Sequence, residues 1–185
     1  MIYLMRHGQD DERFVGGWSD VGLIDSGKKE VDLQGKWLKE NLQIKKIITS
    51  PVYRARQSAE IVNQHLHVPL MCDENLKEQS KGMLNGINKR IVKLRYASFM
   101  DNVDINTVYP GGESLKQLYE RIKEYLNKIY EFGDDTLIVT HRGVINMIYY
   151  ILDDIDLDMQ KERFNVETAS VHELNMSLKK IRRIK

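Results

Sequence analysis

Short apolar runs alternate along this chain with segments whose apolar residues recur every three or four positions. The runs IYLMRH (residues 2–7), KKIITS (45–50), PLMC (69–72) and DTLIVTH (135–141) predict β-strands. They contain few polar interruptions, as is typical of parallel strands that are buried on both faces. We therefore expect Cys72, at the end of PLMC, to be a buried small residue.

The segments with helical spacing predict amphipathic helices between these strands. One apolar stripe runs from Ala55 to Leu66 and a longer one from Leu115 to Ile129. Ser114 and Gln117 fit a capping box at the start of the longer helix. A third helix, over residues 143–152, is apolar nearly all round, so we expect it to be central.

The order of elements is β-α-β-α-β, an irregular middle, α-β-α and a strand-rich ending. This order predicts an α/β fold, a three-layer α/β/α sandwich with a mostly parallel central sheet. No linker or repeat divides the chain, so residues 1–185 are expected to form a single domain. Residues 73–112, with a basic amphipathic piece at 88–96, are expected to pass over the sheet edge as a lid or substrate wall.

Composition and charge narrow the class of protein. Of the 185 residues, 42% are hydrophobic and 30% are charged, and the formal net charge is +1. A nucleic-acid partner is not expected, because such proteins carry a strongly basic face. No apolar run reaches the roughly 20 residues that span a bilayer, and we expect no signal peptide before the first strand. The single cysteine forms no internal disulfide, so we expect a cytoplasmic protein without a membrane partner.

Unusual residues follow three of the predicted strands. Arg6-His7-Gly8 ends the first, Ser50 to Arg54 follows the second, and Thr140-His141-Arg142-Gly143 follows the last before the apolar helix. In an open α/β sheet the carboxyl ends of the strands form the ligand-binding edge. Converging cations, backbone N–H groups and a helix dipole suit a phosphate dianion there. A neutral imidazole adds a nucleophile, so the pattern predicts a phosphoryl-transfer site.

Taken singly, each of these residues also has a structural explanation. Arg6 fits a strand-end charge, and His7 fits a half-buried histidine with satisfied hydrogen bonds. Arg54 fits a first-turn surface residue, and Glu78 fits one of many exposed carboxylates. The joint placement at one sheet edge, rather than any single residue, favours function.

Six blocks of sequence, in order along the chain, resemble one known family. They are RHG (6–8), WSDVGLIDSG (18–27), SPVYRARQSA (50–59), Glu78 with Gly82 and Gly86, PGGES (110–114) and THRG (140–143). The chain resembles the histidine phosphatase superfamily in its phosphoglycerate mutase-like branch, which carries the RHG signature. Together the blocks span residues 1 to about 150.

The resemblance implies a role for each matching residue. His7 would accept the phosphoryl group as the nucleophile, while Arg6, Arg54 and His141 would bind the transferring oxygens. Glu78 would protonate the leaving oxygen and then activate water. Gly8 would keep side-chain atoms away from the phosphate. No metal or other cofactor is expected, and the expected partner is a small phosphorylated metabolite.

The chain departs from the family pattern at two places. Asp10, Asp11 and Glu12 stand where many relatives carry Thr or Ser and then Asn. These acids either face solvent or select against a highly anionic substrate. Arg142 stands where many relatives carry Gly, and it is either an extra phosphate or carboxylate contact or an outward-facing surface residue.

Three functions are compatible with these residues. Cofactor-dependent mutases of the family are typically longer and carry extra basic and aromatic residues after the catalytic glutamate, whereas Gln79-Ser80-Lys81 follows Glu78 here. This shortage favours a metal-independent phosphatase, a phosphomonoesterase that forms phosphohistidine. A cofactor-dependent mutase is the alternative, with a second phosphate bound by the basic residues Lys89, Arg90, Lys93 and Arg95. A non-catalytic phosphate-binding module is the third, but it would lack the nucleophile or the acid. No surface stripe stands apart from the predicted core, so the pattern does not indicate whether the chain forms oligomers.

Overall fold

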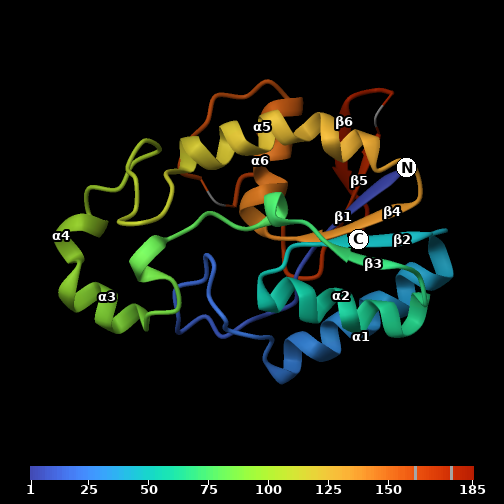
Figure 1. Cartoon of the computed structure of the whole chain (residues 1–185), viewed down its shortest axis with the longest axis horizontal. Helices are drawn as coiled ribbons and strands as arrows, with labels where there is room; N and C mark the ends of the chain where they lie inside the picture. Colours follow the sequence, from blue (N-terminus) through green and yellow to red (C-terminus); the bar gives the residue numbers. More distant parts are fainter. Residues whose placement is uncertain (161, 176) are drawn as a thin grey trace.

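A single six-stranded sheet forms the middle layer of the computed structural model, which describes residues 1–160, 162–175 and 177–185 (Figure 1). The strands are β1 Ile2–Arg6, β2 Lys46–Thr49, β3 Leu70–Cys72, β4 Thr136–Thr140, β5 Val171–Asn175 and β6 Lys180–Arg183. Their order is β3-β2-β4-β1-β5-β6. The first four in this order are mutually parallel, and β5 and β6 each run antiparallel to the preceding strand. This confirms the mostly parallel α/β sheet.

Helices cover both faces of the sheet, with α1 (Asp25–Asn41) and α2 (Tyr53–Leu66) on one and α5 (Leu115–Glu131) and α6 (Arg142–Leu152) on the other (Figure 1). Along β1, Leu4 packs in the core under α5 and α6 and Met5 in the core under α1 and α2. Because neighbouring residues point to opposite faces, two covered faces require an uninterrupted apolar run. The three-layer arrangement thus follows from the strand pattern.

The predicted helical details are also confirmed. Ser114 and Gln117 form the capping box at the start of α5, with both reciprocal hydrogen bonds present. Every residue of α6 from Val144 to Tyr150 is buried, as its all-round apolar pattern predicts. No helix in the described part of the chain is long and apolar enough to cross a membrane.

The prediction that Cys72 is buried is wrong. Cys72 is exposed, and its neighbour Met71 is 51% exposed. Both lie on β3, which is one of the two edge strands of the sheet and pairs with β2. An edge strand at the rim of a helical layer leaves side chains in solvent, although its short apolar run is indistinguishable from that of a buried strand.

The segment 73–112 projects beyond the sheet as a lobe of short elements (Figure 1). These are the 3₁₀ turns η1 (Glu74–Leu76) and η2 (Gly82–Leu84) and the helices α3 (Lys89–Arg95) and α4 (Ala97–Met100). Leu84, Val92 and Tyr109 form a small core of its own. Val92 is the buried side chain of α3, whereas Leu94 is 83% exposed.

Candidate active site

The carboxyl ends of β1, β2 and β4 meet at one edge of the sheet, where a cavity of about 240 Å³ opens. The His7 N–H donates to the Thr140 carbonyl over 2.9 Å, so the ends of β1 and β4 lie side by side. The cavity lining includes the predicted site residues Arg6, His7, Arg54, Glu78 and Arg142. His141 lies directly behind, with its ring centroid 5.2 Å from that of His7. The structure therefore brings the predicted site residues together.

His7 is held in one tautomer by its two partners. Its Nδ1 lies 2.8 Å from the Gly8 carbonyl oxygen, and its Nε2 lies 3.1 Å from Arg54 Nε. A carbonyl only accepts and a guanidinium only donates, so Nδ1 carries the proton and Nε2 carries the lone pair. Burial lowers the pKa of His7 well below its usual value, and the positive charges of Arg54 and Arg6 lower it further. His7 is therefore a neutral imidazole whose lone pair is on Nε2, where it accepts from Arg54.

Arg54 lies beneath the cavity and is only 2% exposed. Besides the hydrogen bond to His7, its guanidinium donates to the Gly17 carbonyl at 2.9 Å and to Ser19 Oγ at 3.5 Å. Burial lowers the pKa of Arg54, while the carboxylates of Asp10 and Glu78 oppose that shift. An arginine starts so high that it stays protonated, so this buried cation is available to an anion.

One ring nitrogen of His141 is buried without a hydrogen-bond partner among the described residues. Val52 N–H donates to Ser50 Oγ at 3.2 Å, and Ser50 Oγ lies 2.8 Å from His141 Nε2. With the Ser50 hydroxyl donating to Nε2, the proton of this neutral ring is on Nδ1. Burial lowers the pKa of His141 well below its usual value, with Arg54 adding to the effect. Its buried Nδ1 has no hydrogen-bond partner among the described residues and suits a phosphoryl oxygen.

Arg6 has a second buried donor of this kind. Its Nη1 donates to the Val166 carbonyl at 2.9 Å, whereas its buried Nε has no partner within the described chain. Burial and then the neighbouring charge of Arg142 lower the pKa of Arg6, and Glu78 opposes them. Two buried nitrogens without partners, on Arg6 and His141, and the guanidinium groups of Arg6 and Arg54 therefore surround the lone pair of His7, as a phosphoryl-binding pocket requires.

Glu78 reaches the pocket from the excursion and contacts the first turn of α6. Its Oε2 accepts the Gly143 N–H at 3.1 Å, and its Oε1 accepts the Gln79 N–H at 2.9 Å. A Cβ on Gly143 would stand only 2.0 Å from Oε1. Glycine at 143 is therefore what permits the close approach, and the start of a helix is a favourable place for a carboxylate.

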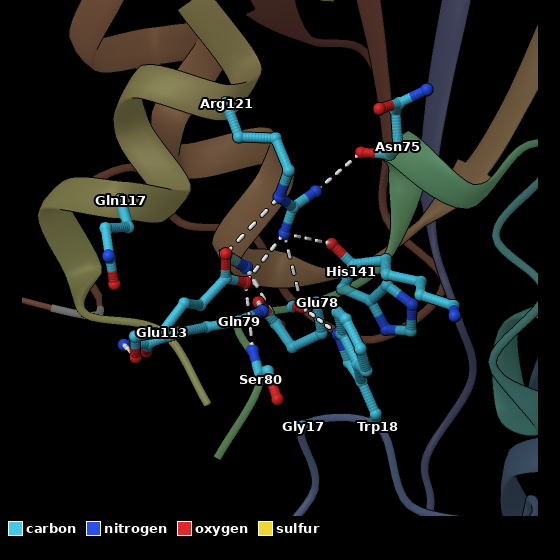
Figure 2. A network of polar contacts seen from close by, with 12 residues as sticks. Gly17, Trp18, Asn75, Glu78, Gln79, Ser80, Glu113, Gln117, Arg121 and His141 are labelled. Carbon is cyan, nitrogen blue, oxygen red and sulfur yellow. Dashed lines mark hydrogen bonds and ion pairs between the residues drawn. The ribbon is translucent and has the colours of Figure 1, made fainter. Parts of the chain in front are cut away.

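A clamp of polar contacts fixes the backbone that carries Glu78 (Figure 2). From α5, the Arg121 guanidinium donates to the carbonyls of Asn75 at 2.6 Å and Lys77 at 3.1 Å, and it pairs with Glu113 Oε1 at 2.8 Å. The same Glu113 oxygen accepts the Ser80 N–H at 2.9 Å. The clamp thus holds the chain on both sides of residue 78.

Sequence reasoning missed Arg121, since it is one of several charges on the polar face of α5. It also missed Trp18, whose indole N–H donates to the Glu78 carbonyl at 2.6 Å. Trp18 stands inside a block that carries the family resemblance, so its motif was a usable signal. Arg121 had no such signal, because only the fold brings it to residues 75–78.

Gly8 has a structural reason that differs from the expected one. A Cβ there would meet Val31 Cγ2 at 2.4 Å and the Gly27 carbonyl oxygen at 2.7 Å, so glycine allows α1 to pack against the end of β1. The Gly8 N–H donates to Ser58 Oγ at 3.0 Å. The close contact at Gly8 is therefore with helix α1, whereas the sequence predicted a close contact with the phosphate.

The remaining predicted residues divide between cavity and solvent. Arg142 lines the cavity and forms an ion pair with Glu162. Asp11 pairs with Arg13 and turns away, whereas Asp10 lines the cavity and Glu12 is exposed at its mouth. Over the described ranges, no three His, Cys, Asp or Glu side chains gather as a candidate metal site.

Comparisons with known proteins agree with this geometry. A family model of the histidine phosphatase superfamily (branch 1) matches residues 2–183. The uncharacterised phosphatase PhoE of Bacillus subtilis (strain 168) is 28% identical over 167 residues, 88% of this chain and 82% of that protein. A 2,3-bisphosphoglycerate-dependent phosphoglycerate mutase of Methylobacterium sp. (strain 4-46) is 28% identical over 172 residues, 84% and 81% of the two chains.

Among solved structures, the alpha-ribazole phosphatase from Shigella flexneri matches with a TM-score of 0.82 at 18% identity. The match covers 99% of this chain and 94% of that one, and at this identity it shows the shared fold. The chain therefore belongs to the histidine phosphatase superfamily and is a phosphoryl-transfer enzyme.

Proposed function

We propose that this protein is a metal-independent phosphatase that hydrolyses phosphomonoesters of small metabolites through a phosphohistidine on His7. One observation carries the proposal. Nδ1 of His7 is held as a donor by the Gly8 carbonyl, which leaves the Nε2 lone pair inside a ring of cations. A buried, neutral and oriented imidazole next to phosphate-binding donors is the arrangement that nucleophilic attack on phosphorus requires.

The reaction divides into two balanced steps. In the first, Nε2 of His7 forms a bond to phosphorus while the bond from phosphorus to the ester oxygen breaks. Glu78, protonated in this step, gives its proton to the departing oxygen. Arg6, Arg54 and the Nδ1–H of His141 neutralise the charge on the phosphoryl oxygens.

In the second step, water attacks phosphorus and the bond from phosphorus to Nε2 breaks. The Glu78 carboxylate takes a proton from that water, which returns both Glu78 and His7 to their starting states and releases inorganic phosphate. The Gly143 N–H stabilises the charged carboxylate that acts as this base.

The rest of the cavity lining supports a phosphatase over a mutase. Of the four basic residues on α3 that a mutase would use for a second phosphate, Lys89 lines the cavity and is exposed, whereas Arg90, Lys93 and Arg95 are exposed outside it. The surrounding wall includes the apolar side chains of Phe14, Val103 and Tyr109. Such a wall suits a leaving group with little negative charge.

A mutase remains the second candidate because of two observations. Lys81 and Lys89 both line the cavity, and one relative of equal identity is a bisphosphoglycerate-dependent mutase. Lys81, however, already donates to Gln79 at 2.5 Å and lies over the Tyr109 ring. It would have to leave both partners to bind a second phosphate.

One assay separates the two reactions. The protein is incubated with EDTA, 3-phosphoglycerate and a trace of 2,3-bisphosphoglycerate, with an aryl phosphate in parallel, and both inorganic phosphate and 2-phosphoglycerate are followed. We expect inorganic phosphate without isomerisation. Rapid formation of 2-phosphoglycerate would instead show a mutase, and activity that EDTA abolishes would refute the metal-independent mechanism. Phosphate binding without turnover of any ester would favour a binding module.

A further inference from the structure

Three consecutive acids follow the nucleophile, and they take three different directions. Asp11 pairs with Arg13, the carboxylate and guanidinium lying 2.5 Å apart in an exposed turn. Glu12 is exposed at the cavity mouth. Asp10 turns inward, is 17% exposed, and places Oδ2 3.5 Å from Arg54 Nε. Asp10 is therefore the acid of this run that reaches the buried guanidinium.

Asp10 and the nucleophile share one atom of Arg54. The same Nε that faces Asp10 donates to His7 Nε2 at 3.1 Å. The other two guanidinium nitrogens each donate one hydrogen, to the Gly17 carbonyl and to Ser19 Oγ. A phosphoryl group attacked by Nε2 must lie beside this shared Nε, and so beside the Asp10 carboxylate.

We propose that Asp10 is a built-in competitor of the phosphoryl group, which weakens the binding of phosphate anions and so promotes release of inorganic phosphate. The inference rests on the proposed hydrolase, which has to discharge this product in every cycle. It also narrows the substrate class to monoesters that carry a single phosphate and no second anionic group near the reacting centre.

The physical basis is the repulsion between a carboxylate and a phosphate dianion across a few ångströms. In a partly solvent-accessible site such a pair costs enough to change an affinity by about tenfold or more. The carboxylate also neutralises Arg54 when the pocket is empty, so a phosphate that binds must replace an interaction that is already satisfied. Both effects lower the affinity for phosphate without removing any of its donors.

The test compares Asp10→Asn with wild type and with Asp11→Asn as the matched control. Asparagine has nearly the shape of aspartate but no charge, and the hydrogen bonds of Arg54 to His7, Gly17 and Ser19 are left in place. Inorganic phosphate is titrated by calorimetry in the absence of any ester. We expect Asp10→Asn to bind phosphate about tenfold more tightly than wild type and Asp11→Asn to bind it as wild type does.

A second variant and a kinetic readout guard against misfolding. Asp10→Ser also removes the charge, and it should likewise tighten phosphate binding and raise product inhibition, with melting temperatures showing that both variants are folded. Equal or weaker phosphate binding in both folded variants would overturn the inference.

Failure of the hydrolase itself gives a different pattern. If phosphate binding tightens in both Asp10 variants while no ester is hydrolysed by any protein, the competitor role of Asp10 stands and the proposed phosphatase falls. If esters are hydrolysed and phosphate affinity is unchanged by Asp10→Asn, the phosphatase stands and the competitor role falls.

Discussion

Two walls of the cavity differ in how their side chains are held. The strand-end wall consists of Arg6, His7, Arg54 and His141, and His7 and Arg54 are only 4% and 2% exposed. Each of these four makes hydrogen bonds to backbone or to a neighbouring site residue. The excursion wall consists of the cavity-lining residues between 81 and 112, namely Lys81, Lys89, Val103, Asp104 and Tyr109. It belongs to short turns and helices in a projecting lobe.

This difference separates the residues that carry out the reaction from those that distinguish one substrate from another. A wall fixed before substrate arrives lowers the cost of organising charge around phosphorus, and this chemistry is common to all phosphomonoesters. A wall on loops and short helices can differ between substrates without disturbing the sheet. Glu78 joins the two, because it lies on the excursion but is fixed to α6 and to the Arg121 clamp.

The largest effect is expected at the nucleophile. His7→Ala removes the atom that bonds to phosphorus, so kcat should fall by about 10⁴-fold or more. Binding of inorganic phosphate should survive, because Arg6, Arg54 and His141 remain. Steady-state kinetics and calorimetry measure the two quantities. A variant that retained kcat within tenfold would remove His7 from the chemistry.

Glu78→Gln should have the next largest effect and should depend on the leaving group. An alkyl phosphate needs a proton on its departing oxygen, so kcat/KM should fall by about 10²–10³-fold. p-Nitrophenyl phosphate has a leaving group that departs without a proton, so its kcat/KM should fall much less. Equal losses for the two substrates would show that Glu78 is not the acid.

The clamp gives a smaller effect that acts through Glu78. Arg121→Met should lower kcat/KM for the alkyl phosphate about tenfold, the size expected of a displaced rather than a missing catalytic group. It should cause no further loss in a Glu78→Gln background. Arg182→Met, which breaks an exposed pair with Glu173 on the last two strands, is the control. Additive losses in the double variant would show that the clamp does not act through Glu78.

The strand-end wall was predictable because strand ends, glycines and short motifs are local features. The apolar runs give the parallel sheet, and a parallel sheet gathers residues 6–8, 50–54 and 140–143 at one edge. What the pattern could not give was the tautomer of His7, since that depends on the direction of the Gly8 carbonyl. The opposite directions of Asp10 and Asp11 are equally invisible in a run of three acids.

The excursion wall was less predictable for a physical reason. Its elements are too short for periodicity to show which side is buried, so the alternation of Ile91, Val92 and Leu94 did not reveal that Val92 is the buried one. The prediction that Cys72 is buried was wrong for a related reason, because strand order rather than composition decides which strand lies at an edge. Arg121 lies 43 residues from Glu78, and only tertiary structure brings them together.

The two buried histidines of the strand-end wall should make the stability of the protein depend on pH. Burial holds the pKa values of His7 and His141 well below that of an unfolded histidine, about 6.5. Below that pH the unfolded chain takes up protons that the native state does not, so the free energy of unfolding falls as pH falls. His141→Gln should make this slope shallower between pH 6 and pH 5, by up to about 1.4 kcal/mol per pH unit. Denaturant titrations measure it, and parallel slopes would contradict the burial of a neutral His141.

The smallest effect is expected on the excursion wall. The Lys89 side chain is exposed and lines the cavity without a hydrogen bond or ion pair to the described residues, so Lys89→Ala should change kcat/KM for a monophosphate ester by less than about threefold. Arg90→Ala, on the same helix but outside the cavity, is the control. A loss of tenfold or more at Lys89 alone would indicate a second anion-binding subsite and favour the mutase.

The most direct measurement is to trap the phosphorylated enzyme. The protein is mixed with labelled substrate in EDTA, quenched within milliseconds under alkaline conditions that preserve phosphohistidine, and mapped by mass spectrometry. We predict phosphate on Nε2 of His7, formed and consumed at rates compatible with turnover, and none in His7→Ala. Full turnover with no phosphorylated His7, or with phosphate on another side chain, would contradict the mechanism.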